Sequence, residues 1–308
     1  MSNPAVPFNL RSYELHANNP YGDERIIRSW SAEDTIDAWR HRRMHESLDP
    51  FLRHCPGLSW LTVGDGRYGT DAHYILTHGG RALATDISEK HLARAKHDGF
   101  IADYRIVNCE QLTFADGQFD FVCCKESFHH FPRPMLALYE MLRVARLAVV
   151  LIEPADKSIV LQRGRRQVRI SRRQAMKNFI RDVLGVPRYE YFSDTIGEYE
   201  TVGNFMYGIS QREIEKVALG LNLKAVAFKG INDFYVEGVE LEQACETSAL
   251  FQEVKAKIEE QDRKCERGAE QYGLLVAAIL KETPDQTLGN ALTKAGYNLI
   301  KLPANPYA

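Results

Sequence analysis

The feature that most constrains this chain is a glycine-rich turn between a short apolar segment and a helical segment. Residues 61–69 read LTVGDGRYG, and a second apolar segment follows and ends in the acid Asp86. Closely spaced glycines allow a tight turn and a close approach of the backbone to a ligand. A carboxylate at the end of the second strand can accept hydrogen bonds from ribose hydroxyls. The pattern therefore predicts a βαβ unit that binds an adenosine-containing cofactor.

The glycine spacing alone does not identify that cofactor. Gly64, Gly66 and Gly69 satisfy the dinucleotide fingerprint, and Asp86 lies near the distance that this fingerprint requires. The same layout also serves enzymes that use S-adenosylmethionine (SAM), in which the glycine turn faces the methionine moiety. A glycine turn with no ligand is the remaining alternative.

The segments after Asp86 distinguish between these cofactors. In chain order they are a helical segment at 89–98, the run RIVNCEQLTF at 105–114, the strand-like run FDFVCCKESFHHF at 119–131, a helical segment at 134–143, and AVVLIEP at 148–154. In order and spacing the series resembles the class I SAM-dependent methyltransferases, especially the branch that acts on small molecules. The resemblance covers about residues 60–154. It implies an α/β Rossmann-like fold with a seven-stranded, mostly parallel sheet, helices on both faces, and SAM as cofactor.

The resemblance also implies roles for individual residues. The glycine turn would lie under the methionine portion of SAM, Asp86 would bind the ribose, and Ile87 would pack against the adenine. Asn108 to Glu110 stand beside the adenine position, and Lys125 ends the fourth strand near the transferred methyl group. The residues that the resemblance assigns to the cofactor are Gly64, Asp65, Gly66, Asp86, Ile87, Asn108, Cys109, Glu110 and Lys125.

Two departures from the family pattern concern the methionine end of the cofactor. Thr62 stands where the family usually has an acid, and Tyr68 adds one residue to the glycine spacing. Asp65 is one candidate for the missing carboxylate, and backbone oxygens with water are the other.

Methyl transfer to a hydroxyl benefits from a general base, and histidine is the usual choice because its pKa lies near neutral pH. His129 and His130 directly follow the fourth strand, beside the expected methyl position, so we take both as candidate catalytic residues. Structural roles in capping or in the core are the alternative for each. Tyr68, Tyr207 and Tyr235 are candidates for the substrate cleft. No metal-binding triad stands out, so no metal is expected.

The rest of the chain is organised around this core. Residues 1–50 are expected to form an N-terminal helical lid over the cofactor cleft, with a helix start near Ser31. A helix that only packs on the core is the alternative. Residues 51–155 form the SAM-binding half of the core. Residues 156–204 form a cap insertion, and residues 205–282 supply a helix at 211–220, strand six at 223–230 and strand seven at 272–280. Residues 283–308 are read as a C-terminal tail.

The cap insertion is densely basic, with ten lysines and arginines between residues 157 and 188 and Asp182 as the single acid. Arg173, Lys177 and Arg181 share one face of a predicted amphipathic helix. Because arginine binds phosphate and carboxylate oxygens bidentately, Arg173 is a candidate for an anionic, phosphate-linked saccharide-type substrate. A solvated charged face is the competing interpretation.

Composition is consistent with a cytoplasmic enzyme. The net charge of −2 provides no basic field for nucleic acid, and no segment is apolar and long enough to span a membrane. The six cysteines show no Cys-x-x-Cys spacing, which favours free thiols. The expected partner is a small-molecule substrate, with a homo-oligomer left open. The alternatives are an NAD-dependent oxidoreductase and a SAM-fold binding protein without catalysis.

Overall fold

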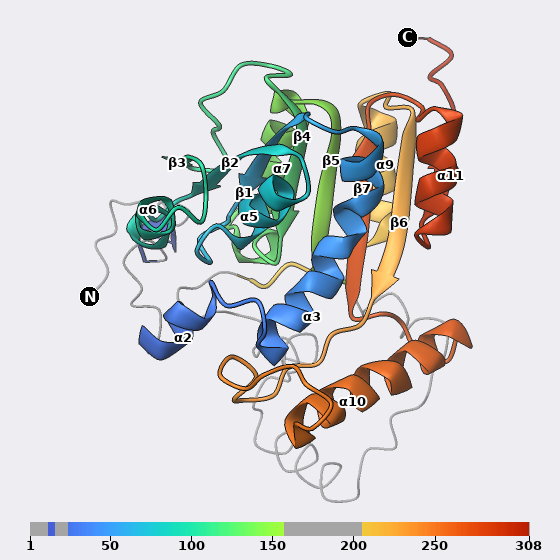
Figure 1. Ribbon diagram of the computed structural model, residues 1–308. Helices are drawn as coiled ribbons and strands as arrows, with labels where there is room; N and C mark the ends of the chain where they lie inside the picture. Colours follow the sequence, from blue (N-terminus) through green and yellow to red (C-terminus); the bar gives the residue numbers. More distant parts are fainter. Residues whose placement is uncertain (1–11, 16–23, 157–204, 308) are drawn as a thin grey trace, which may run out of the picture.

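The computed structural model describes residues 12–15, 24–156 and 205–307 of the chain. The predicted cap and Arg173 lie outside the described residues, as does the greater part of residues 1–23. The described residues form one central sheet with helices on both faces (Figure 1).

The sheet has eight strands in the order β3-β2-β1-β4-β5-β7-β6-β8. The strands are β1 (Ser59–Val63), β2 (Arg81–Asp86), β3 (Tyr104–Ile106), β4 (Phe119–Lys125), β5 (Ala145–Pro154), β6 (Ala225–Ile231), β7 (Leu274–Leu280) and β8 (Asn298–Lys301). The pairs β1–β2, β1–β4, β2–β3 and β4–β5 are parallel, whereas β7 is antiparallel to β5 and β6. This confirms the predicted fold class, with eight strands where seven were expected.

The eighth strand and the helix before it come from the segment that was read as a tail. Helix α11 (Gln286–Lys294) begins at the N-cap Asp285, whose side chain accepts a hydrogen bond from the backbone N–H of Leu288. Strand β8 then adds to the edge of β6 in antiparallel register. Tyr297, between α11 and β8 in the chain, is buried, and its hydroxyl donates to the carbonyl oxygen of Ser47 at 2.7 Å. Residues 286–301 are therefore part of the core.

The remaining helices cover both faces of the sheet. They are α2 (Glu24–Ser29), α3 (Ile36–His45), α4 (Asp49–His54), α5 (Thr70–Thr77), α6 (Lys90–His97), α7 (Pro134–Val144), α9 (Gln211–Gly220) and α10 (Ala249–Glu266). Helix α3 starts later than Ser31: Thr35 is its N-cap and accepts from the N–H of Ala38. A short 3-10 turn, η1 (Glu46–Leu48), joins α3 to α4.

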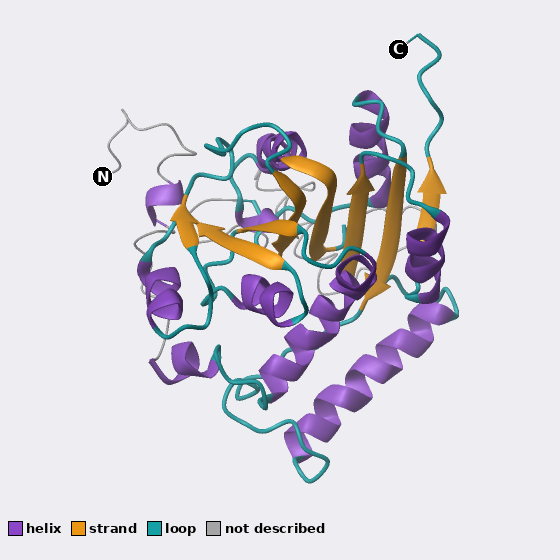
Figure 2. Cartoon of the chain, turned by 45° about the horizontal axis from the view of Figure 1, so that its top comes forward, coloured by secondary structure: helices purple, strands orange, loops and turns teal. Residues whose placement is uncertain are grey.

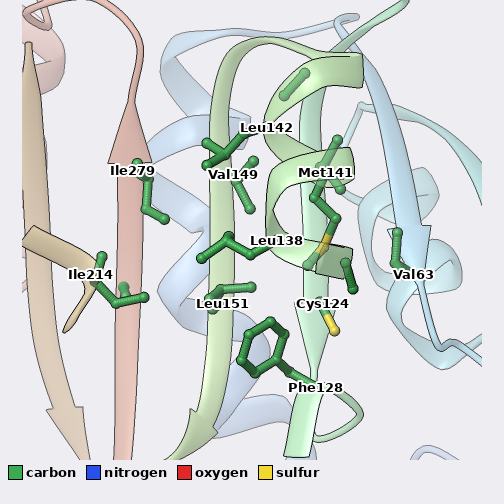
Figure 3. Close-up of a cluster of buried hydrophobic side chains, with 14 of the residues drawn as sticks. Val63, Cys124, Phe128, Leu138, Met141, Leu142, Val149, Leu151, Ile214 and Ile279 are labelled. Carbon is green, nitrogen blue, oxygen red and sulfur yellow. The ribbon is translucent and has the colours of Figure 1, made fainter. Parts of the chain in front are cut away.

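Two apolar layers separate the sheet from these helices, because successive strand residues point to opposite faces. Val149 and Leu151 of β5 pack on α7 and α9 (Figure 3). Val150 and Ile152 of the same strand belong to the other layer, with side chains of α3, α4, α5 and α11. Burial of each such Val, Leu or Ile side chain stabilises the fold by about 1.5–3 kcal/mol.

The order of the strands also places the site. The chain runs outward from β1 to β3 and then returns to β4 on the other side of β1, so the carboxyl ends of β1 and β4 flank a crevice. Helices α2, α3 and α10 lie on the side of the sheet to which the arrowhead of β6 points (Figure 1). Ile36 of α3 packs against Phe251, Val254 and Ile258 of α10, and the two helices lie side by side in Figure 2.

Candidate active site

The glycine turn after β1 closes against the ends of β2 and β4. Gly64 has a φ of +76°, and a Cβ atom there would lie 2.4 Å from Cβ of Ser127. A Cβ atom on Gly66 would lie 2.7 Å from Oδ2 of Asp86. Neither position accepts a side chain without displacing its neighbour. The glycines are thus required by the approach of the loop to Ser127 and Asp86.

A cavity of about 300 Å³ opens at this turn. Six of the predicted site residues line its wall: Gly64, Gly66, Asp86, Ile87, Cys109 and His130. The other described lining residues are Tyr13, Trp30, Val63, Arg67, Thr85, Val107, Glu126, Ser127 and Phe131. We refer to it as the cofactor cavity.

Asp65 lies outside that cavity because its carboxylate faces the first turn of α5. Oδ1 accepts from the N–H of Asp71 at 3.1 Å, and Oδ2 accepts from the N–H of Ala72 at 2.9 Å. The hydroxyl of Thr62 donates to Oδ2 at 2.8 Å. Burial and the neighbouring Asp71 raise the pKa of Asp65 well above its usual range. Thr62 therefore orients a helix-capping carboxyl, and Asp65 is engaged at the helix instead of in the cofactor cavity.

Asn108 and Glu110 also use their side chains within the loop. Oδ1 of Asn108 accepts from the N–H of Glu110 at 2.9 Å. The Glu110 carboxylate accepts from the hydroxyl of Tyr13 at 2.9 Å and from Nε of Arg133 at 2.6 Å. Cys109, between them, lines the cavity, with its Sγ 3.3 Å from the Tyr13 hydroxyl. Burial raises the pKa of Cys109 to about 12, so its thiol is neutral at pH 7.

A second cavity of about 540 Å³ adjoins the first. The two share Trp30, Gly64, Arg67, Glu126, Ser127 and His130. The wall of the second cavity also contains the predicted residues Asp65, Lys125, His129 and Tyr235, together with Asp37, Arg40 and His41 of α3, and Asp233 and Glu240. We refer to it as the acceptor cavity, because a molecule there would lie next to one in the cofactor cavity.

Lys125 belongs to the wall of the acceptor cavity and not to that of the cofactor cavity. Its Nζ lies 3.1 Å from Nδ1 of His41, 3.4 Å from Oδ1 of Asp71 and 3.6 Å from Oε2 of Glu126. Burial opposes the charge, but Asp71 and Glu126 outweigh burial and raise the pKa of Lys125. In contrast, burial together with the cations Arg67 and Lys125 lowers the pKa of His41 well below 6.5. Lys125 is therefore charged and His41 neutral at pH 7.

His129 is held by a fully buried carboxylate. Its Nδ1 lies 2.7 Å from Oε2 of Glu153, which is 0% exposed at the end of β5. Oε1 of Glu153 accepts from the N–H groups of Ser127 and Phe128 at 2.9 and 3.0 Å. These contacts fix the orientation of the ring. A carboxylate at Nδ1 favours the tautomer with the proton on Nδ1, which leaves Nε2 in the acceptor form.

Comparison with known families is consistent with this geometry. Residues 61–152, from β1 to β5, match the model of the family described as a methyltransferase domain. The chain contains a class I SAM-dependent methyltransferase domain. SAM is accordingly its cofactor, and the enzyme is a methyltransferase.

Several solved structures are similar to the methyltransferase over most of its length. Magnesium protoporphyrin IX methyltransferase from Synechocystis PCC 6803 with bound SAM is 14% identical, covering 90% of this chain and 99% of that chain, with a TM-score of 0.47. A possible histamine N-methyltransferase from Thermotoga maritima is 13% identical, covering 80% and 95%, with a TM-score of 0.44. The putative methyltransferase solved with the Haloferax volcanii Trm112 activator is 16% identical, covering 83% and 100%, with a TM-score of 0.45. No curated protein sequence matches the chain.

Two predicted substrate residues of the methyltransferase lie outside both cavities. Tyr68 packs with Leu92 and Ile101 under α6, and its hydroxyl donates to Asp98. The hydroxyl of Tyr207 donates to Glu213 at 2.5 Å, and its ring packs edge-on against Phe128. Their positions do not support the predicted contacts with substrate. None of the described helices has the length and apolar character that a membrane crossing requires.

The main residues that sequence reasoning missed come from α3 and its partners. Arg40 donates to Asp37 at 3.0 Å and to Oδ1 of Asp233 at 2.9 Å, and its guanidinium lies 5.3 Å from the Tyr235 ring. Asp37 also pairs with Arg67 of the glycine loop. Asp37, Arg40 and His41 share one face of a helix, a signal that the sequence contained. Nothing local indicated that this face is buried against the cavity.

Proposed function

We propose that this methyltransferase transfers the methyl group of SAM to a hydroxyl or amine of a small polar molecule in the acceptor cavity, with His129 as general base. The observation that supports this best is the 2.7 Å contact between His129 Nδ1 and the buried Glu153, on a wall next to the cofactor cavity. SAM supplies an activated sulfonium methyl group, so the protein contributes alignment, exclusion of water and proton transfer.

His129 would accept the proton that the acceptor releases. Glu153 keeps the other ring nitrogen protonated, and its negative charge stabilises the imidazolium that forms. Because the Glu153 carboxylate is fully buried and also accepts two backbone N–H groups, it cannot rotate away from the ring without breaking those bonds. The base is thus held in one orientation before the acceptor binds.

In the cofactor cavity, Asp86 would bind the ribose hydroxyls and Ile87 would pack against the adenine. Oδ1 of Asp86 accepts from the N–H of Ser88 at 2.7 Å, which fixes the carboxylate toward the glycine turn. Cys109 would lie beside the adenine, with its thiol neutral. Asn108 and Glu110 would act indirectly, by shaping the loop that presents Cys109.

The acceptor is expected to be polar, since charged side chains dominate the described part of its cavity. That part contains six carboxyl side chains and three permanent cations, Arg40, Arg67 and Lys125. Arg40 is already paired with Asp37 and Asp233. The described wall therefore favours a neutral or cationic acceptor. An anionic, phosphate-linked saccharide-type acceptor stays a prediction that depends on the basic segment at 157–204.

The test uses SAM with a labelled methyl group and the small-molecule fraction of a cell extract. Wild type should label a low-mass product. His129→Asn should bind S-adenosylhomocysteine as wild type does and transfer far less label, with the acidic limb of the pH–rate profile lost. His130→Gln is the matched control, because His130 lines both cavities and its ring centroid lies 3.9 Å from that of His129. Wild-type rates in His129→Asn would refute the base, and label in macromolecules alone would refute the small acceptor.

A further inference from the structure

Arg67 is unusual among the residues of the cofactor cavity. It directly follows Gly66 in the turn, and it is the single lysine or arginine among the described residues that line this cavity. The carboxylates on the same described wall are Asp86 and Glu126. A bound anionic group would be repelled by these two acids, so Arg67 offers the matching charge.

Helix α3 fixes the guanidinium of Arg67. Nη2 donates to Oδ2 of Asp37, and Nη1 contacts Nε2 of His41. The guanidinium also lies 5.7 Å from the Trp30 ring. Asp37 is itself buried and held by Arg40 at 3.0 Å. Arg67 is thereby positioned before any ligand binds, which reduces the entropy lost on binding.

One nitrogen of the Arg67 guanidinium makes neither of these contacts. Its Nε is buried and has no hydrogen-bond partner among the described residues. A buried donor without an acceptor is unfavourable by about 1–3 kcal/mol, so such a group commonly meets a ligand or water. Since SAM is the cofactor, the anionic group that reaches this cavity is the α-carboxylate of its methionine moiety.

We propose that Arg67 binds the α-carboxylate of SAM through its Nε–H, while Asp37 and His41 of α3 hold its other nitrogens. This gives the carboxylate of the methionine moiety a partner. Thr62 and Asp65, which the sequence offered for the acid at this end of the cofactor, are both engaged at the start of α5. The contact with Arg67 also ties cofactor recognition to α3, whose Arg40 and His41 line the acceptor cavity.

The test is calorimetric titration with SAM and with decarboxylated SAM, which keeps the ammonium and lacks the carboxylate. Wild type should prefer SAM by about 10- to 100-fold, the range of one charged hydrogen bond. Arg67→Gln should lose that preference and bind decarboxylated SAM as wild type does. Arg67→Lys keeps the positive charge beside Asp37 and should show an intermediate preference.

Asp86→Ala is the matched control, since loss of a ribose contact should weaken both ligands equally and leave their ratio unchanged. The proposal is overturned if wild type binds both ligands equally, or if Arg67→Gln and Arg67→Lys keep the full preference. An equal loss for both ligands in both variants would also overturn it, by indicating a structural role. Because the readout is binding, it does not depend on His129 or on the acceptor.

Discussion

The substitution Glu153→Ala tests whether the carboxylate that contacts His129 stabilises the folded protein. The side chain is 0% exposed and accepts from Ser127 N–H, Phe128 N–H and His129 Nδ1 at 2.9, 3.0 and 2.7 Å. Hydrogen bonds to a charged acceptor contribute about 1.5–3 kcal/mol each, with some relief from entering water. We therefore expect the free energy of unfolding to fall by about 3–6 kcal/mol.

Glu153→Gln is the matched variant for this measurement. Its amide oxygen can still accept from Ser127 and Phe128, so the loss in unfolding free energy should be about 1–2 kcal/mol. The amide NH₂ group would face Nδ1 of His129 and favour the tautomer protonated at Nε2. Urea unfolding gives both free energies, and ¹⁵N NMR of the His129 ring reports the tautomer. A cost below about 1 kcal/mol for Glu153→Ala would refute the reasoning, as would equal costs for the two variants.

Three further predictions concern the glycine turn and α3. Gly66→Ala should weaken SAM binding about tenfold, because its Cβ atom displaces the Asp86 carboxylate, and it should not lower the urea midpoint. Calorimetry measures the affinity for SAM, and an unchanged affinity would contradict the close approach. Thr62→Val should lower the free energy of unfolding by about 1–2 kcal/mol, since Asp65 loses a buried donor; the urea midpoint checks this. Because the pKa of native His41 lies well below 6.5, the unfolded chain binds an extra proton below about pH 6.5. The urea stability of wild type should therefore fall between about pH 6.5 and 5 more steeply than that of His41→Gln, and parallel curves would contradict this.

The parts of the fold that could be predicted from the sequence are those that depend on the local order of residues along the chain. The glycine turn, the acid at the end of β2 and the succession of strands follow from residues close together in the chain, and the structure has them. Strand β8 escaped prediction because NLIK at 298–301 is short and half polar, and its pairing with β6 spans a long separation. Glu153 was within reach of prediction: it ends β5, the neighbour of β4, so its side chain meets the turn that holds His129.

Tyr68 and Asp65 both lie outside the cofactor cavity, and the two positions have a common physical reason. Both follow Gly64 in a loop where the backbone reverses direction, so the face that each side chain takes depends on individual φ angles. Tyr68 itself has a φ of +60°, which directs its ring toward α6 instead of the crevice. Sequence spacing places a residue in such a loop, but it does not give the direction of the side chain.

The polar contacts of α3 indicate how the two cavities are held together. Asp37, Arg40 and His41 come from one helix, and their partners come from three other segments: the glycine loop at Arg67, the loop after β6 at Asp233, and the end of β4 at Lys125 and Glu126. Buried ion pairs add little net stability, because desolvation offsets most of the attraction between the charges. Their directional contacts nevertheless specify one arrangement of the four segments. The polar contacts of α3 therefore fix the walls of the two cavities relative to one another, and the apolar contacts of α3 with the sheet and with α10 provide its stability.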